Sequence, residues 1–275
     1  TEQEKTCFLR SLAFASNLDG LLVNSLSEVI KPNITSPEVV LAIARQIYEE
    51  CLHVDSYSCM IEAVGLDPEE VYGLYRKDKH LFYKNKRVLE SMYAINKPDF
   101  STDSLQGAKD FLEACTTNLI FEGIFFFSAF LVFYNFGRHN KMPGSKEMIQ
   151  FINRDEDLHV RLFINIINTI KEEQPEVWSD DVKAKMKKNI LDAVEMEIEW
   201  GVSCIGEGIL GITPVMLTEY IQFIGDMRLE GIGLGKHFNG ANPFPWLDEF
   251  TQSNMIETNF FEGTVREYQS GSLEW

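Results

Sequence analysis

The feature that most limits how this chain can fold is the apolar stretch 118–136, NLIFEGIFFFSAFLVFYNF, which holds a single acid, Glu122. As a helix, the stretch is long enough to cross a lipid bilayer. However, a carboxylate at that depth is costly in lipid, no second span is evident, and the flanking residues show no one-sided excess of Lys or Arg. We therefore interpret 118–136 as a helix buried on all sides in a large soluble bundle, with no membrane partner.

Helical signals cover most of the chain. Apolar residues recur every three to four positions, and Ser-Pro and Thr-Pro pairs mark helix starts at Pro37 and Pro214. Alternating β patterns are rare, and neither an internal repeat nor a flexible linker is evident. The sequence thus predicts one all-α domain over 1–275, with an irregular tail from about 239. The predicted helices span 4–30, 36–64, 68–96, 101–136, 146–172, 179–199 and 213–235.

Charge and cysteine content narrow the range of functions. The chain has 42 acidic and 25 basic residues and a net charge of −17, which argues against direct binding to nucleic acid or to anionic lipid. Its five cysteines are scattered, odd in number and never in CxxC spacing. This pattern favours reduced thiols, and we expect a cytoplasmic protein.

Two Glu-x-x-His motifs give the first chemical signal. One runs from Glu50 to His53 and the other from Glu156 to His159, each within a predicted helix. Residues three apart share a helix face, so each pair can reach one ion, and a carboxylate with an imidazole suits iron or manganese. A single copy is more often a solvated Glu beside a surface His. Two copies are more specific, because carboxylate-bridged dimetal bundles combine them with a lone acid on each of two further helices.

Two other predicted helices supply such acids. Glu122 lies among Phe and Ile residues, where a carboxylate is costly unless a metal, a proton or an Arg neutralises it. Asp19 lies between apolar residues and before Gly20, although an ordinary polar residue near a turn would look the same. Four carboxylates carry a charge that two divalent ions would balance. The candidate ligands are Asp19, Glu50, His53, Glu122, Glu156 and His159.

Tyr57 is a candidate redox residue beside this ligand set. It lies one helical turn after His53 and two turns after Glu50, so all three share one helix face. A phenol beside a dimetal centre can be oxidised by one electron. A core tyrosine whose hydroxyl bonds a neighbour would occupy the same position, and spacing alone does not separate the two interpretations.

Taken together, these segments resemble the small, radical-generating subunit of class I ribonucleotide reductases. The resemblance lies in LDGLLVN around Asp19, EECLHVDSY at 49–57, FEGIFFFSAF at 121–130 and RDEDLH at 154–159. NPFPW from Asn242 to Trp246 and the segment 259–269 are similar to the C-terminal part of that family. The likeness covers about residues 10–270 and implies a ferritin-like helical bundle with extra helices.

The resemblance implies roles for the site residues. Two metal ions, with iron expected and manganese as the alternative, would react with oxygen and oxidise Tyr57 to a neutral radical. Asp155 would hydrogen-bond His53 and fix the orientation of its ring. Some relatives carry Phe at the radical position and use a manganese–iron pair, and Tyr57 argues against that subgroup. The apolar pocket that shields the radical is matched by Phe126, Phe130 and Ile152.

The resemblance also implies how the radical is used. Tyr268, in the tail, would relay the oxidising equivalent to the large subunit, the expected partner, where ribonucleotides are reduced to deoxyribonucleotides for DNA replication. A homodimer is expected as well. The family has a relay tryptophan upstream of the first ligand, whereas none of the 18 residues before Asp19 is Trp. We therefore expect that an N-terminal segment is missing from this sequence.

Three other classes of protein remain open on the sequence alone. A ferritin-like iron storage protein uses the same ligand motifs, but it needs neither Tyr57 with Phe neighbours nor a Glu-Tyr-Gln tail. A dimetal oxygenase needs an open substrate channel, against which the Phe-rich surroundings of Glu122 argue weakly. A stable tyrosyl radical would separate the reductase from both. A helical bundle without metal would leave four acids and two histidines unexplained on apolar helix faces.

Overall fold

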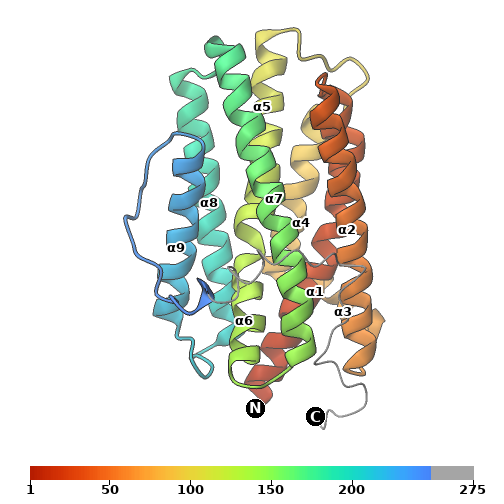
Figure 1. Cartoon of the computed structure of the whole chain (residues 1–275), viewed down its shortest axis with the longest axis vertical. Helices are drawn as coiled ribbons and strands as arrows, with labels where there is room; N and C mark the ends of the chain where they lie inside the picture. The colour runs from red at the N-terminus through yellow and green to blue at the C-terminus, as the bar shows by residue number, and fades with distance from the viewer. Residues whose placement is uncertain (249–275) are drawn as a thin grey trace.

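The computed structural model describes residues 1–248, and its helices run side by side along the long axis of the molecule (Figure 1). The described residues form no strand, only an isolated bridge between Ile209 and Ile212. The predicted all-α fold is therefore confirmed. In chain order the α-helices are α1 (Glu2–Asn24), α2 (Pro37–Ala63), α3 (Pro68–Gly73), α4 (Lys79–Ile95), α5 (Leu105–Ile120), α6 (Phe127–Arg138), α7 (Pro143–Glu173), α8 (Asp180–Ile205) and α9 (Pro214–Gly231).

Side-chain caps begin two helices where the sequence predicts them. Ser36 accepts a hydrogen bond from the N–H of Val39, and Thr213 accepts one from the N–H of Met216. In both helices a proline is the first residue, where its missing N–H is not needed. The predictions 36–64 and 213–235 thus agree with α2 and, to within about one turn, with α9.

The predicted helix 68–96 is wrong in one respect, because it divides into α3 and α4. A 3-10 turn, η3 (Leu74–Arg76), follows α3. Asp78 then accepts hydrogen bonds from the N–H groups of His80 and Leu81 and begins α4 as a separate helix. The cap signal lies in the sequence, but the apolar periodicity continues across it.

The predicted helix 101–136 also differs from the structure. It begins at Leu105, because Ser104 rather than an earlier residue caps it. A π turn, η4 (Phe121–Phe125), then separates α5 from α6. A π turn inserts one residue into the helix, so it rotates everything that follows by about 100° relative to a continuous α-helix. Glu122 lies in this turn.

Two further helices extend beyond their predicted bounds. α7 begins at Pro143 rather than near 146, because Met142 adopts a left-handed conformation, with φ of 52°, that turns the chain directly into the helix. α8 continues past 199 to Ile205 and ends at Gly206, which has a φ of 59° that glycine adopts readily. The first helix ends in a second π turn, η1 (Ser25–Ile30), within the predicted range 4–30.

The apolar stretch forms the centre of the bundle. α5, η4 and α6 make one continuous rod, Leu105–Arg138, which is the one described segment that is long and apolar enough to cross a membrane. Its most apolar part is completely buried by protein, in agreement with the predicted core helix. α7 packs against α2 and against η4, while α1 packs against α2 and α6. This packing brings together the four segments that carry the candidate ligands.

Candidate metal centre

Four neighbouring segments supply the six candidate ligands. α1 and η4 each contribute one acid, and α2 and α7 each contribute a Glu-x-x-His pair on one face. No side chain of the six is more than 2% exposed, so the structure gathers all of them in the interior. The six are Asp19, Glu50, His53, Glu122, Glu156 and His159.

Glu50 and Glu156 each face both histidines. The Nδ1 atom of His53 lies 3.4 Å from Oε2 of Glu50 and 3.1 Å from Oε1 of Glu156. The Nδ1 atom of His159 lies 3.1 Å from Oε1 of Glu50 and 2.9 Å from Oε2 of Glu156. Each carboxylate thus turns one oxygen toward each imidazole. This is the arrangement expected of two carboxylates that bridge a pair of ions.

Asp19 and Glu122 lie at the two ends of this cluster. Oδ2 of Asp19 is 3.7 Å from Nδ1 of His53, and Oε2 of Glu122 is 3.8 Å from Nδ1 of His159. We call the end with Asp19 the first ion position and the end with Glu122 the second ion position. At each position the potential ligand atoms lie within 4.8 Å of one another, and both positions include Glu50 and Glu156.

Buried atoms without hydrogen-bond partners mark the space between these side chains. Among residues 1–248, no hydrogen bond reaches either carboxylate oxygen of Asp19, one oxygen each of Glu50, Glu122 and Glu156, or Nδ1 of His53. Buried polar atoms are normally hydrogen-bonded, so a set that converges without partners indicates a cation site. The donors are oxygen and imidazole nitrogen without thiolate, which suits iron or manganese.

The electrostatics of the cluster lead to the same conclusion. Burial and the charges of Glu50 and Glu156 raise the pKa values of Asp19 and Glu122 well above their usual range. Burial lowers the pKa of both histidines, but the surrounding carboxylates outweigh it and raise these pKa values well above normal. Asp19, Glu122 and both histidines therefore favour the uptake of protons, whereas for Glu156 burial raises the pKa but His159 and His53 lower it by more. Two divalent cations would replace those protons and leave the carboxylates ionised.

Each histidine also has a carboxylate on its outward nitrogen. Nε2 of His53 lies 3.5 Å from Oδ2 of Asp155, the pairing that the sequence resemblance implies. Nε2 of His159 lies 3.1 Å from Oε2 of Glu49, which is absent from the predicted set. With Nε2 held by a carboxylate, Nδ1 of each ring is left to bind a cation. The one sequence signal for Glu49 is its place directly before a candidate ligand.

Gln46 is a second site residue that the sequence prediction missed. Its Nε2 atom donates a hydrogen bond to Oε1 of Glu122 at 2.6 Å and another to Oε1 of Glu50 at 3.5 Å. The side chain is 1% exposed. Gln46 holds one oxygen of Glu122 and leaves the other directed toward His159. It lies one turn before Glu50, but a glutamine in a helix is too common for this spacing to signal a site.

Tyr57 is fully buried, and its hydroxyl has no hydrogen-bond partner among the described residues. Burial raises its pKa well above the usual range, and the nearby carboxylates, Asp19 first among them, raise this pKa further. The structure thus places Tyr57 beside the cluster, as its helix spacing predicts. The role of Tyr57 as a redox residue stays a prediction.

The remaining predicted site residues have different outcomes. Phe126, Phe130 and Ile152 are all buried, and the rings of Phe126 and Phe130 stack with centroids 5.5 Å apart. Their role as a shield around Tyr57 stays a prediction. Tyr268 lies outside the described residues.

Comparison with known proteins gives one consistent result. A family profile described as "Ribonucleotide reductase, small chain" matches residues 1–243. The chain is 38% identical to the ribonucleoside-diphosphate reductase subunit beta of Chlamydia pneumoniae over 277 residues, which cover 100% of this chain and 80% of that protein. It is 34% identical to the protein of the same description from Treponema pallidum, over 98% of this chain and 76% of that protein.

A solved structure agrees with these sequence matches. The ribonucleotide reductase R2 subunit from Clostridium botulinum superposes with a TM-score of 0.83 and 31% identity, covering 91% of this chain and 78% of that one. The range matched by the family profile contains all six clustered side chains and Tyr57, but it ends before Tyr268.

Proposed function

Because this chain belongs to the ribonucleotide reductase small-chain family, we propose that its six clustered side chains hold two metal ions and that Tyr57 carries the radical. The chain is the small subunit of a ribonucleoside-diphosphate reductase, an enzyme in which such a subunit works with a large subunit. Membership of this family sets aside the iron-storage and oxygenase alternatives.

The observation that carries the proposal is that the two carboxylate oxygens of Glu50, and likewise those of Glu156, face different histidines. Each of these acids turns one oxygen toward His53 and the other toward His159. Two ions would therefore share both acids, and each ion would keep one histidine and one further acid of its own. Tyr57 follows His53 by one turn of α2, which supports its role as the group that the centre oxidises.

When bound, the metal pair with oxygen supplies the oxidising power that removes one electron and one proton from Tyr57. The residues of the chain hold and protect the reacting group. The proton leaves from Oη of Tyr57, and Asp19 is the carboxylate whose charge acts most strongly on this hydroxyl. Phe126, Phe130 and Ile152 exclude water and reductants from the phenol ring.

We propose iron as the native metal, with manganese as the alternative. The oxygen and imidazole donors suit both elements. Iron comes first because the resemblance to the family implies it.

Aerobic reconstitution with Fe(II), followed by metal counting and electron paramagnetic resonance, tests the proposal. We expect about two irons per chain, since six ligands serve two ions, together with a tyrosyl radical signal. Two ions without a radical would contradict the role of Tyr57. A protein that retains no metal would overturn the proposal as a whole.

Tyr268→Phe tests the proposed relay to the large subunit. We expect the metal content and the radical signal to be unchanged, because the substitution lies far along the sequence from every ligand. Turnover with the large subunit is expected to fall to the background of the assay, because phenylalanine cannot carry the oxidising equivalent. Nucleotide reduction and radical content are measured on the same sample. Normal turnover would end the relay proposal.

We further propose that 1–275 is a single domain that forms a homodimer in the cytoplasm. Apolar side chains exposed on α2 and α4, such as Leu41, Tyr48 and Tyr93, are candidates for a contact between two copies. Cys51 and Cys59 are exposed and unpaired, as expected in a reducing compartment. The mass in solution by light scattering checks the dimer, and the mass of one chain would contradict it.

A further inference from the structure

The π turn η4, which carries Glu122, is held by an ion pair from two other helices. Lys84 of α4 donates a hydrogen bond from Nζ to the main-chain oxygen of Phe125, at 3.2 Å. Glu197 of α8 accepts a hydrogen bond from the main-chain N–H of Ser128, at 3.0 Å. The two side chains also bond each other. The pair therefore binds one main-chain group at the end of the π turn and one in the first turn of α6.

Both members of this pair are completely buried. The ammonium group of Lys84 lies 3.5 Å from the ring centroid of Phe14, 4.3 Å from that of Trp200 and 4.7 Å from that of Phe125. Burial lowers the pKa of Lys84, and Glu197 opposes that shift. Three aromatic rings and the carboxylate of Glu197 thus surround the ammonium group and hold it in one place.

A third charged side chain, from α9, binds the main chain of the π turn. Arg228 of α9 donates a hydrogen bond from Nε to the main-chain oxygen of Gly123, at 2.8 Å, and it is 6% exposed. A Cβ atom at position 123 would lie 2.7 Å from that same Nε, so a side chain there would displace the arginine. Glycine directly after Glu122 therefore has a physical reason.

The main-chain groups at this junction need such partners. A π turn interrupts the regular hydrogen-bond ladder, and the first N–H groups of the following helix have no partner inside that helix. A change back to continuous α-helix would rotate α6 by about 100° relative to Glu122. Whatever fixes the π turn therefore fixes where the Glu122 carboxylate points.

Stability alone does not account for the ion pair. Taking two charges out of water is costly, and apolar side chains of the same volume often replace a buried pair without loss of stability. What a buried pair can supply is one specific conformation, because it tolerates little displacement of its partners. Here those partners include the main chain of the segment that carries a candidate ligand.

We propose that Lys84, Glu197 and Arg228 form a clamp that holds η4 in its π conformation and so keeps the Glu122 carboxylate at the second ion position. These three are positioning residues that act through the main chain. The inference rests on the proposed function, since it assigns the clamp to one of the two proposed ions. It predicts that loss of the clamp weakens the second ion and spares the first.

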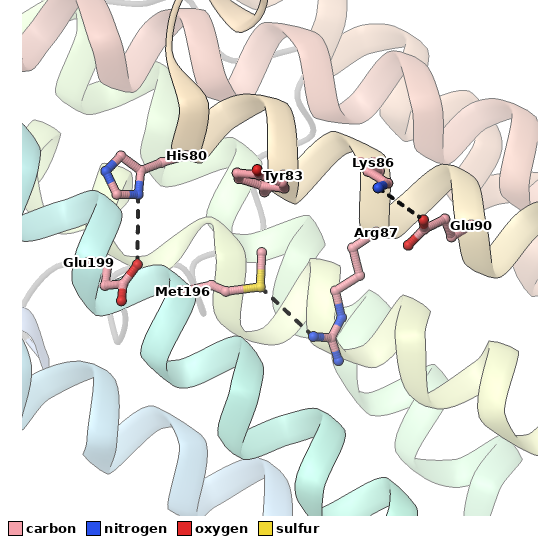
Figure 2. A pocket seen from close by; sticks show the side chains of 7 residues that line it. All are labelled: His80, Tyr83, Lys86, Arg87, Glu90, Met196 and Glu199. Carbon is pink, nitrogen blue, oxygen red and sulfur yellow. Dashed lines mark hydrogen bonds and ion pairs between the residues drawn. The ribbon is translucent and has the colours of Figure 1, made fainter.

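The two helices that carry the ion pair also line an open pocket of about 350 Å³ between them (Figure 2). Arg87 of α4 donates to the main-chain oxygen of Asn189 at 2.8 Å and approaches the sulfur of Met196 at 3.8 Å. Nδ1 of His80 lies 4.0 Å from a carboxylate oxygen of Glu199 (Figure 2). These contacts hold α4 against α8 and so support the contact between Lys84 and Glu197.

The test measures binding of Mn(II) alone, without oxygen and without turnover. The main variant is Lys84→Met with Glu197→Leu, which removes both charges and leaves neither unpaired. Titration followed by the signal of free Mn(II) gives a dissociation constant for each ion. We expect one of the two constants, that of the second ion, to rise by about 10- to 100-fold, the range known for residues one step removed from a ligand. The other constant is expected to stay unchanged.

A second pair of variants guards against a general loss of folding. Arg228→Met removes the donor to Gly123 and should weaken the second ion, whereas Arg228→Lys keeps a charged donor and should restore part of the affinity. Asp226→Asn is the matched control on the same helix. Asp226 is buried and accepts hydrogen bonds from the main chain of three residues at 237–239, away from η4. It should reduce thermal stability and leave both constants unchanged.

Each result separates the clamp from the proposed function. Wild-type protein that binds two Mn(II) ions, with a folded double variant that binds both equally well, would overturn the clamp alone. Equal weakening of both ions in the clamp variants and in Asp226→Asn would also overturn it, because the effect would then be general destabilisation. Wild-type protein that binds no Mn(II) would overturn the metal centre and the clamp together.

Discussion

Tyr57→Phe is expected to abolish nucleotide reduction while the protein keeps both metal ions. Phenylalanine fills nearly the same volume, so the ligands on α2 keep their places, but the ring lacks the hydroxyl that is oxidised. The radical signal should disappear and turnover with the large subunit should fall to background. The hydroxyl of Tyr57 is buried without a hydrogen-bond partner among the described residues. Removal of this hydroxyl should therefore not lower the free energy of unfolding of the metal-free protein, and could raise it by about 1–3 kcal/mol.

Tyr134→Phe is the matched control. Tyr134 is also a buried tyrosine, on α6, but its hydroxyl lies 3.5 Å from the main-chain oxygen of Ile149. That variant should keep the radical and its activity and lose a little stability. Metal counting, electron paramagnetic resonance, turnover and thermal unfolding are measured for both variants. A radical signal or turnover that survives in Tyr57→Phe would assign the radical to another residue.

The ligand cluster could be predicted because its chemistry follows helix periodicity. A Glu and a His three residues apart share a face in any α-helix, so the pairs on α2 and α7 needed no tertiary information. Glu122 was recognisable because an acid within an apolar stretch is costly without a partner. All six predicted side chains accordingly converge in the structure.

The supporting residues could not be predicted in the same way. Glu49 and Gln46 meet His159 and Glu122 only because α2, η4 and α7 pack at particular distances. The π turn at η4 leaves no trace in the apolar pattern, since every neighbouring position is buried on all sides. Lys84 and Glu197 read as ordinary surface charges on amphipathic helices, and their burial depends on contacts distant in sequence.

Glu156→Ala and Glu122→Ala are expected to differ in the number of ions retained. Glu156 faces both histidines, so its loss removes an oxygen from each ion position. Glu122 faces His159 alone, so its loss affects the second ion position only. We expect close to no tightly held ion in Glu156→Ala and about one in Glu122→Ala, against two in the wild type. Metal counting after gel filtration of protein loaded with Fe(II) without oxygen measures the difference.

The comparison is informative because the two substitutions remove the same atoms from equally buried sites. Both side chains are 0% exposed, so the cavity and the lost packing are alike, and a difference in metal content reports the difference in coordination. The charge argument points the same way. Without Glu156, His53 and His159 each lose their shortest carboxylate contact within the cluster, whereas loss of Glu122 leaves both contacts in place. Two ions retained in Glu122→Ala would remove Glu122 from the ligand set, and one ion retained in Glu156→Ala would show that Glu156 does not bridge.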